Sequence, residues 1–333
     1  LARRHDLGNQ AGFINAALRN ALREKPQWLE RLAELRERQP AVGYSHPQWL
    51  VNRWHHRWPD DTDALLKWNN QPAPIYARRN TLRVTAEELE AQWMQEKVSF
   101  SPCDLAWLSP GLMYRIKAEG SPAALASFAE GQFYIQDPST VASVQELDPR
   151  PGDNILDLCA APGGKTTAIA QRMQDDGAVL AIDIDERRLD LLRDNAERLG
   201  VSCIQPKVLA QIDLKNAGPF DRILIDAPCS NTGVMRRRVD VRWRLHAREL
   251  PTLARTQLDL LKRAAPLLKR GGVLVYSTCS IEPEENEEVI AAFLRKHRDF
   301  RQENSRTLTP MKDGTDGAFV ARLRLPEPET AES

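Results

Sequence analysis

Short apolar runs with turn-forming residues at their ends recur through the second half of this chain. Runs of this length and composition predict buried strands, and helical patterns of apolar residues separate them. The repeated order of strand and helix predicts an α/β fold with a doubly wound, Rossmann-like sheet. The predicted strands lie at residues 154–158, 178–183, 202–206, 221–226 and 272–277, and a final hairpin lies near 299–303 and 317–325.

The first 40 residues carry apolar side chains at helical spacing, such as Phe13, Ala17 and Ala21, and predict helices. These helices either help to hold RNA or pack on a neighbouring element. Residues 41–75 are rich in proline and tryptophan. We expect an irregular linker or helical connector there, with its tryptophans packed in a core.

A small α+β domain is predicted over residues 76–130. Its helix begins at Ala86, with Thr85 as N-cap and an acidic first turn, a combination that favours helix starts. The α/β domain follows over residues 131–325. The tail at 326–333 is rich in proline and glutamate, and we expect it to be disordered.

Composition narrows the class of protein. The 333 residues include 46 basic and 46 acidic side chains, so net charge by itself implies no polyanionic partner. Five cysteines at wide spacing argue against a disulfide framework or a metal site and favour a reducing cytoplasm. No apolar run is long enough to span a bilayer. We therefore expect a cytoplasmic monomer with no membrane partner and no metal.

A local excess of positive charge follows the predicted strand at 221–226. Arg236, Arg237 and Arg238 stand a few residues after Cys229. Such a run is commonly a solvated surface. Because this one would line the rim of a crevice beside the thiol, we predict that it contacts phosphates.

The strand at 154–158 runs into a glycine-rich loop at 159–165. Gly163 and Gly164 let the backbone approach a ligand closely, and the helix that follows offers free amide groups. The end of this loop matches the phosphate-binding loop of nucleotidases, but that motif requires glycine where Cys159 stands. A nucleotide-type ligand is therefore expected, without a nucleotidase loop.

An acidic residue, Asp183, ends the next strand, about twenty residues after the glycines. In doubly wound folds an acid at this position binds ribose hydroxyls. The alternative is that an acid here caps the helix that begins at Glu186.

Two cysteines, Cys229 and Cys279, each follow a predicted buried strand. If the strands are parallel, both thiols emerge at the sheet edge that carries the glycine loop. A thiolate that adds to C6 of cytosine makes C5 nucleophilic enough to accept a methyl group, and elimination then restores the ring. Asp226 offers a group that stabilises the ring at N3 and N4. The alternative is that both cysteines are small buried hydrophobic residues.

Three stretches resemble the signatures of one enzyme family. The sequences DLCAAPGGKTT at 157–167, DAPCSNTG at 226–233 and YSTCSIEPEEN at 276–286 are similar to motifs of the Sun/NOL1/NOP2 family of RNA cytosine-5 methyltransferases. Residues 1–40 resemble the C-terminal part of the NusB-like domain of its RsmB/Sun type. The resemblance implies a Rossmann-like methyltransferase that uses S-adenosylmethionine and acts on RNA, with 16S ribosomal RNA as the expected substrate.

The resemblance also implies a role for each motif residue. Cys279 would be the nucleophile, Cys229 would assist release of the product, and Asp226 would contact both cofactor and base. Lys165 would also contact RNA, and Asp183 would bind the ribose of the cofactor. The residues that would bind S-adenosylmethionine are Cys159, Ala160, Ala161, Pro162, Gly163, Gly164 and Lys165.

Two positions depart from the family pattern. The sequence IQPKV at 204–208 holds no acid where the family usually has a Gly-Asp pair, and Asp213 lies several residues further on. Ala318 stands where the last-strand motif has an aromatic residue. The first departure supports an alternative function, a catalytically weakened RNA-binding or ribosome-assembly protein on the same scaffold.

Overall fold

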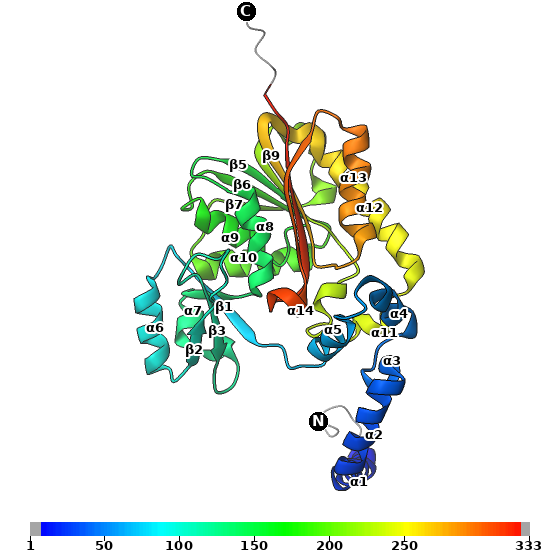
Figure 1. Ribbon diagram of the computed structural model, residues 1–333. Coiled ribbons are helices and arrows are strands. Elements are labelled where there is room, and N and C mark those ends of the chain that lie inside the picture. Colours follow the sequence, from blue (N-terminus) through cyan, green and yellow to red (C-terminus); the bar gives the residue numbers. More distant parts are fainter. Residues whose placement is uncertain (1–7, 328–333) are drawn as a thin grey trace, which may run out of the picture. The chain divides into compact units, whose positions relative to one another are not determined.

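The computed structural model describes residues 8–327, and the chain divides into two compact units, Leu1–Asn70 and Gln71–Ser333. Most of the predicted tail lies outside the described residues. None of the described helices is long and apolar enough to cross a bilayer. The first unit is helical (Figure 1), with helices α1 (Ala11–Arg23), α2 (Lys25–Arg38), α3 (Pro40–Gly43), α4 (Gln48–Arg57) and α5 (Thr62–Asn69). The NusB-like assignment of residues 1–40 stays a prediction.

Of the two alternatives predicted for 41–75, the structure has the helical one, because helices α3, α4 and α5 occupy most of this stretch. Trp54 on α4 and Leu66 on α5 are fully buried, which confirms core packing for that tryptophan. Two of the prolines that suggested an irregular chain lie at helix starts, since Pro40 is in the first turn of α3 and Pro47 is the N-cap of α4. Proline is tolerated there because the first helical amides need no intrahelical acceptor.

The second unit begins with a small α+β domain of four antiparallel strands in the order β2-β3-β1-β4. Trp93 packs edge-on against Tyr114 and Phe133, with ring centroids 5.2 and 5.5 Å away. Thr85 caps α6 as predicted, in a capping box with Glu88. The sheet extends past the predicted boundary at 130. Its elements are β1 (Ile75–Arg79), α6 (Ala86–Gln95), β2 (Ser99–Pro102), β3 (Met113–Lys117), α7 (Ala126–Ala129) and β4 (Phe133–Ile135).

A seven-stranded sheet in the order β10-β11-β9-β8-β5-β6-β7 organises the rest of the unit. The five strands from β9 to β7 are parallel, and β11 and β10 add an antiparallel hairpin at one edge. The predicted doubly wound α/β fold is confirmed. The elements are α8 (Val141–Leu147), β5 (Asn154–Leu158), α9 (Gly164–Arg172), β6 (Ala178–Asp183), α10 (Glu186–Leu199), β7 (Ile204–Val208), β8 (Phe220–Asp226), α11 (Val241–Arg244), α12 (Leu250–Ala264), β9 (Leu268–Thr278), α13 (Glu287–Lys296), β10 (Arg301–Leu308), α14 (Pro310–Asp313) and β11 (Ala318–Arg324).

The third strand of the parallel sheet, β7, lies two residues later than predicted and runs past Pro206. The prediction ended the strand at this proline. Since β7 is at the edge of the sheet, proline can remain within it, because an edge strand leaves one row of its backbone groups unpaired.

Helices cover both faces of this sheet, with α8, α9 and α10 on one face and α12 and α13 on the other (Figure 1). Successive strand residues alternate between the two cores. Ile223 and Ile225 pack with Phe293 of α13, whereas Leu224 packs with Ile169 of α9. Burial on both faces explains why the strands read as continuous apolar runs.

A buried arginine joins the small sheet to the glycine-rich loop. Arg78 of β1 is 1% exposed, and its guanidinium donates to the carbonyl oxygen of Gly164 at 2.6 Å and to Thr167 Oγ1 at 2.9 Å. Burial lowers its pKa to about 10, so the side chain stays charged at neutral pH. The first turn of α9 is thereby held by a charge-assisted contact with the small domain.

Asn80 makes a second buried connection, and its removal tests the junction. Its amide donates to the carbonyl oxygens of Gly131 and Leu199, both at 2.8 Å. Asn80→Ala leaves both oxygens buried without this donor, so we expect the free energy of unfolding to fall by about 2 to 4 kcal/mol in urea titrations. Asp194→Ala, at an exposed site on α10, should change it by less than about 0.5 kcal/mol. Equal effects would contradict the structural role of Asn80.

Candidate active site

Three loops meet at the carboxyl edge of the parallel strands. Strands β9, β8 and β5 are neighbours in the sheet, so the loops that follow them lie side by side. These loops carry the three motifs at 157–167, 226–233 and 276–286. The arrangement is the one expected from the sequence.

The two motif cysteines are in contact, with Cys229 Sγ and Cys279 Sγ 3.3 Å apart. Asn231, in the left-handed conformation with φ 61°, lies against both. Its Oδ1 accepts from Cys279 Sγ at 3.1 Å, and its Nδ2 donates to the carbonyl oxygen of Cys229 at 2.8 Å. One amide side chain thus connects the two cysteine loops.

Local interactions keep two of the thiols protonated. The pKa of Cys229 is raised well above its ordinary value, first by the hydrogen bond with Cys279 and then by burial. Burial, with nearby carboxylates, raises the pKa of Cys159 to about 12. Cys159 therefore lines the loop as a neutral side chain and is not a candidate nucleophile.

An ion pair stands next to the thiols. Lys165 Nζ pairs with the carboxylate of Asp226, and Ser277 Oγ donates to Asp226 Oδ1 at 3.0 Å. Burial disfavours the charge on Lys165, but the attraction of Asp226 outweighs it and the pKa of Lys165 is raised. Lys165 is therefore charged at neutral pH, and the ion pair fixes the position of both side chains.

The glycine-rich loop leaves a carboxylate oxygen free for a ligand. Gly163 has φ 103°, and a Cβ there would lie 2.9 Å from Leu192 Cγ, so this turn requires glycine. Thr166 Oγ1 donates to Asp157 Oδ2 at 2.7 Å. Asp157 is fully buried, and its Oδ1 has no hydrogen-bond partner in the part of the chain that the structure describes. Burial raises the pKa of Asp157 to about 7.

Two cavities meet at the ion pair. The first, of about 210 Å³, is lined by the glycine-rich loop and Asp157, and we call it the loop cavity. The second, of about 350 Å³, is lined by Cys279, Asn231 and neighbouring residues, and we call it the thiol cavity. Lys165 and Asp226 line both cavities. A molecule in the loop cavity and another in the thiol cavity would therefore meet at these two side chains.

Asp183 lies behind the loop and lines neither cavity. Its carboxylate accepts from the backbone amides of Ala161 and Asp185, both at 3.1 Å, and pairs with Arg188 at 3.4 Å. In this arrangement the buried side chain holds the loop, and the ribose contact stays a prediction. The helix cap considered as the alternative is Asp185, whose Oδ1 accepts from the Arg187 amide at 2.9 Å.

Two of the three predicted phosphate-binding arginines are paired with carboxylates of the protein. Arg236 is 6% exposed and pairs with Asp316 at 3.1 Å. Arg237 pairs with Asp316 and, at 2.8 Å, with Asp137. These carboxylates, distant in sequence, argue against phosphate contact by Arg236 and Arg237. Arg238 is exposed and lines the thiol cavity.

Glu285, which the sequence did not single out, joins the two cysteine loops. This fully buried carboxylate accepts from the Ser230 amide at 2.8 Å, from Ser280 Oγ at 2.5 Å and from Gln257 Nε2 at 3.0 Å. Burial raises its pKa. A signal was present, because a serine follows each motif cysteine and an acid shares their motif, but only the fold brings these groups together.

Two family models match the chain. Residues 144–324, more than half of the chain, match the model of the 16S rRNA methyltransferase RsmB/F. The chain belongs to the RsmB/F family. Residues 46–108 match the ferredoxin-like domain of RsmF/B-like methyltransferases. The family resemblance predicted from the three RsmB/F motifs is confirmed.

Relatives of this RsmB/F methyltransferase are similar over most of its length. It is 37% identical over 321 residues to ribosomal RNA small subunit methyltransferase B of Serratia proteamaculans, covering 94% of this chain and 72% of the relative. The probable ribosomal RNA small subunit methyltransferase B of Bacillus subtilis is 33% identical over 338 residues, with 94% and 74% covered. These matches establish an rRNA methyltransferase of the RsmB/F family.

Solved structures share the fold. A methyltransferase homolog protein from Pyrococcus horikoshii superposes with a TM-score of 0.73 at 29% identity, covering 85% of this chain and 97% of that one. NSun6 from the same organism, solved with SFG, has a TM-score of 0.72 at 24% identity and covers 85% and 99%. At that identity NSun6 supports the fold alone.

The methyl donor of RsmB/F methyltransferases is S-adenosylmethionine, and the loop cavity fits it. The free Oδ1 of Asp157 and the carboxylate of Asp226 suit a ligand that carries positive charge. Gly163 itself does not line this cavity, and its missing Cβ makes room for Leu192. The predicted loop residues that line this cavity are Cys159, Ala160, Ala161, Pro162, Gly164 and Lys165.

The departure in the third strand leaves the loop cavity without an acid from that strand. No residue of 204–213 lines the cavity. Asp213 is exposed and accepts from Asn216 Nδ2 at 2.7 Å. Within residues 8–327, no group of three or more His, Cys, Asp or Glu side chains is arranged to hold a metal ion.

The raised pKa of Asp157 predicts a pH dependence of stability. Its pKa of about 7 in the folded chain lies above its ordinary value of 3.8, so the folded state holds a proton that the unfolded state has lost. As the pH rises from 4 to 7, the free energy of unfolding of the wild type should therefore fall by about 1 kcal/mol per pH unit relative to that of Asp157→Asn. Thermal unfolding across this range measures the difference. Asp190→Asn, at an exposed site, should keep the wild-type dependence, and parallel curves for wild type and Asp157→Asn would contradict the assignment.

Proposed function

We propose that this RsmB/F methyltransferase forms 5-methylcytosine in 16S ribosomal RNA through a covalent adduct between Cys279 and C6 of the target cytosine. One observation carries the proposal. The two thiols lie 3.3 Å apart, and the cavity lined by Cys279 meets the loop cavity at Lys165 and Asp226. The proposed nucleophile, the groups that would bind the cytosine and the site for the methyl donor are thus neighbours.

The reaction follows from these positions. The Cys279 thiol first loses its proton to solvent. Its sulfur then attacks C6, an S–C6 bond forms, and the electron pair of the C5–C6 double bond makes C5 nucleophilic. S-adenosylmethionine, when bound, supplies an electrophilic methyl group for C5. Loss of the C5 proton to a base returns electrons to the ring, and the S–C6 bond breaks with its electron pair on sulfur. Because Cys229 stays protonated, it can donate to the departing Cys279 sulfur at 3.3 Å, which supports its role in release.

Asp226 and Lys165 suit recognition of cytosine. A carboxylate accepts a hydrogen bond from the exocyclic N4 amine of cytosine, which uracil lacks. Lys165 pairs with this carboxylate and so fixes the position of its acceptor oxygens. Since Asp226 also lines the loop cavity, we assign it to both base and cofactor.

The substrate assignment rests on the family. The matched family model is a 16S rRNA methyltransferase, and the Serratia relative is named for small subunit ribosomal RNA. We propose 16S rRNA as the substrate, the cytoplasm as the place of reaction and a monomer as the active form. A catalytically weakened RNA-binding protein is not favoured, because both thiols, Asp226 and Lys165 stand together.

Transfer to unmethylated 16S rRNA tests the function. Incubation with methyl-labelled S-adenosylmethionine should place label on C5 of cytosine, read by nucleoside mass spectrometry. Label on another atom or base would contradict the proposal, and RNA binding without transfer would favour the weakened protein.

Substitution of each motif cysteine by alanine distinguishes the roles of Cys229 and Cys279. Cys279→Ala should lower turnover by about 10⁴-fold or more and trap no adduct, because the nucleophile is gone. Cys229→Ala should accumulate a protein–RNA adduct on denaturing gels, because departure of the sulfur is slowed. Cys103→Ala, at a thiol that lines neither cavity, should leave turnover unchanged. An adduct with Cys279→Ala but not with Cys229→Ala would reverse the two roles.

Glu285 acts as a positioning residue for both cysteine loops. Glu285→Gln replaces one acceptor oxygen by an amide NH₂ group that would face hydrogen-bond donors, so we expect kcat to fall by about 10- to 100-fold. The KM values for RNA and S-adenosylmethionine should stay within about twofold, since Glu285 lines neither cavity. Glu288→Gln, at an exposed site, is the control. A rise in KM without loss of kcat would contradict the positioning role.

A further inference from the structure

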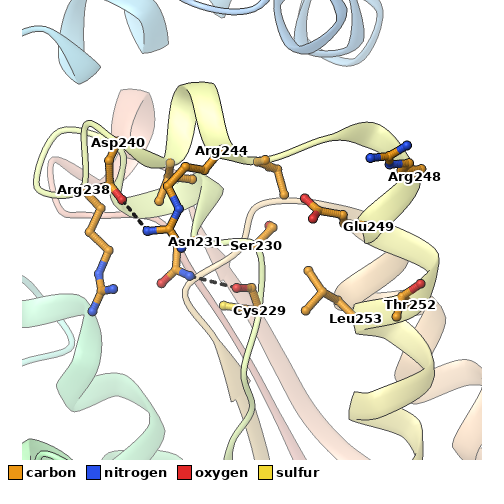
Figure 2. A pocket seen from close by; sticks show the side chains of 12 residues that line it. Cys229, Ser230, Asn231, Arg238, Asp240, Arg244, Arg248, Glu249, Thr252 and Leu253 are labelled. Carbon is orange, nitrogen blue, oxygen red and sulfur yellow. Dashed lines mark hydrogen bonds and ion pairs between the residues drawn. The ribbon is translucent and has the colours of Figure 1, made fainter.

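We propose that a groove on the outer side of Cys229 binds the RNA backbone next to the target cytosine. This outer groove, of about 580 Å³, is formed by the loop after β8, helix α11 and the start of α12 (Figure 2). The inference rests on the proposed function and adds the path of the RNA strand. The residues that carry it are Cys229, Asn231, Arg238, Arg244, Arg248 and Leu253.

The outer groove adjoins the place proposed for the target base. Asn231 and Arg238 line both the outer groove and the thiol cavity. Cys279 lines only the thiol cavity, whereas Cys229 lines the groove. A nucleotide that turns its base into an enzyme pocket stays covalently joined to its neighbours. Its backbone must therefore leave through an adjoining space, and the outer groove is such a space.

Two arginines in the groove are available for phosphates. Arg238 and Arg248 lie at opposite ends of the groove (Figure 2) and are exposed. Across the described residues, neither guanidinium makes a hydrogen bond or ion pair. This distinguishes them from Arg236 and Arg237, whose guanidinium groups are held by carboxylates. Unpaired guanidinium groups on a groove rim are suited to phosphate oxygens.

The acidic side chains of the groove are already engaged. Asp240 Oδ2 pairs with Arg244 at 2.8 Å, a contact drawn in Figure 2. Glu249 Oε2 accepts from the backbone amide of His246 at 2.8 Å. Because both carboxylates have partners, they oppose a phosphate less than free acids would. Arg238 and Arg248 are therefore the side chains on which the proposal depends.

The floor between the arginines is apolar. Val241, Leu245 and Leu253 line the groove, and each is at least partly buried. A ribose or a base can rest on such a floor while phosphates reach the charged ends. We assign Arg238, at the junction with the thiol cavity, to a phosphate of the target nucleotide and Arg248 to a phosphate further along the strand.

Binding of transcribed 16S rRNA to the full chain carrying Cys279→Ala tests the groove without methyl transfer. The groove variant combines Arg238→Gln and Arg248→Gln. The control combines Arg263→Gln and Arg270→Gln, two exposed arginines at the far end of α12 and at the amino end of β9. Both pairs remove the same charge. Filter binding from 50 to 200 mM salt measures the dissociation constant and its salt dependence.

The groove variant should weaken binding by about 10-fold or more and reduce the slope of log K against log salt by about 1.4 to 1.8, for two lost phosphate contacts. The control should change binding by less than about 3-fold. Equal changes for the two pairs, or none for the groove pair, would overturn the proposal. If the modified atom were not cytosine C5, this comparison would still decide the groove, because it measures binding alone.

Discussion

The site depends on one buried carboxylate shared by two loops. Glu285 accepts hydrogen bonds from Ser230 beside Cys229 and from Ser280 beside Cys279. A buried carboxylate is unfavourable unless donors surround it, so the loops are stable only when both present their donors together. That condition brings the two sulfur atoms to 3.3 Å. The same network therefore contributes to stability and sets the distance that the proposed chemistry requires.

A second internal network, centred on Asp316, separates Arg236 and Arg237 from the exposed Arg238. Asp316 binds Arg236 and Arg237, which ties the loop before β11 to the loop after β8. Backbone contacts reinforce the connection, because the Gly317 amide donates to the Gly233 carbonyl at 2.8 Å and the Gly233 amide donates to the Cys279 carbonyl at 3.0 Å. A Cβ on Gly233 would lie 2.5 Å from Gly317 oxygen. These backbone contacts hold the loop in a chain that has Ala318 in place of an aromatic residue.

The order of the cavities suggests how the proposed function is organised in space. The loop cavity meets the thiol cavity at Lys165 and Asp226, and the thiol cavity meets the outer groove at Asn231 and Arg238. Methyl donor, target base and RNA backbone can then occupy adjoining spaces. Each junction is held by polar side chains that can contact both neighbours, so the chemistry follows from adjacency at one sheet edge.

The sequence alone determined the strands, the α/β class and the three motifs, because burial on both faces and tight turns leave local patterns. It also identified Cys229, Cys279 and Asp226 as candidates, which the structure places together. It could not assign Asp183 to the loop behind the cavity, Arg236 to Asp316, or Glu285 to the cysteine loops. Those partners come from other elements, and Arg236 and Asp316 are 80 positions apart. Only the tertiary structure therefore decided that Arg236 is neutralised by Asp316 and that Arg238 faces solvent, because the sheet brings these loops to one edge.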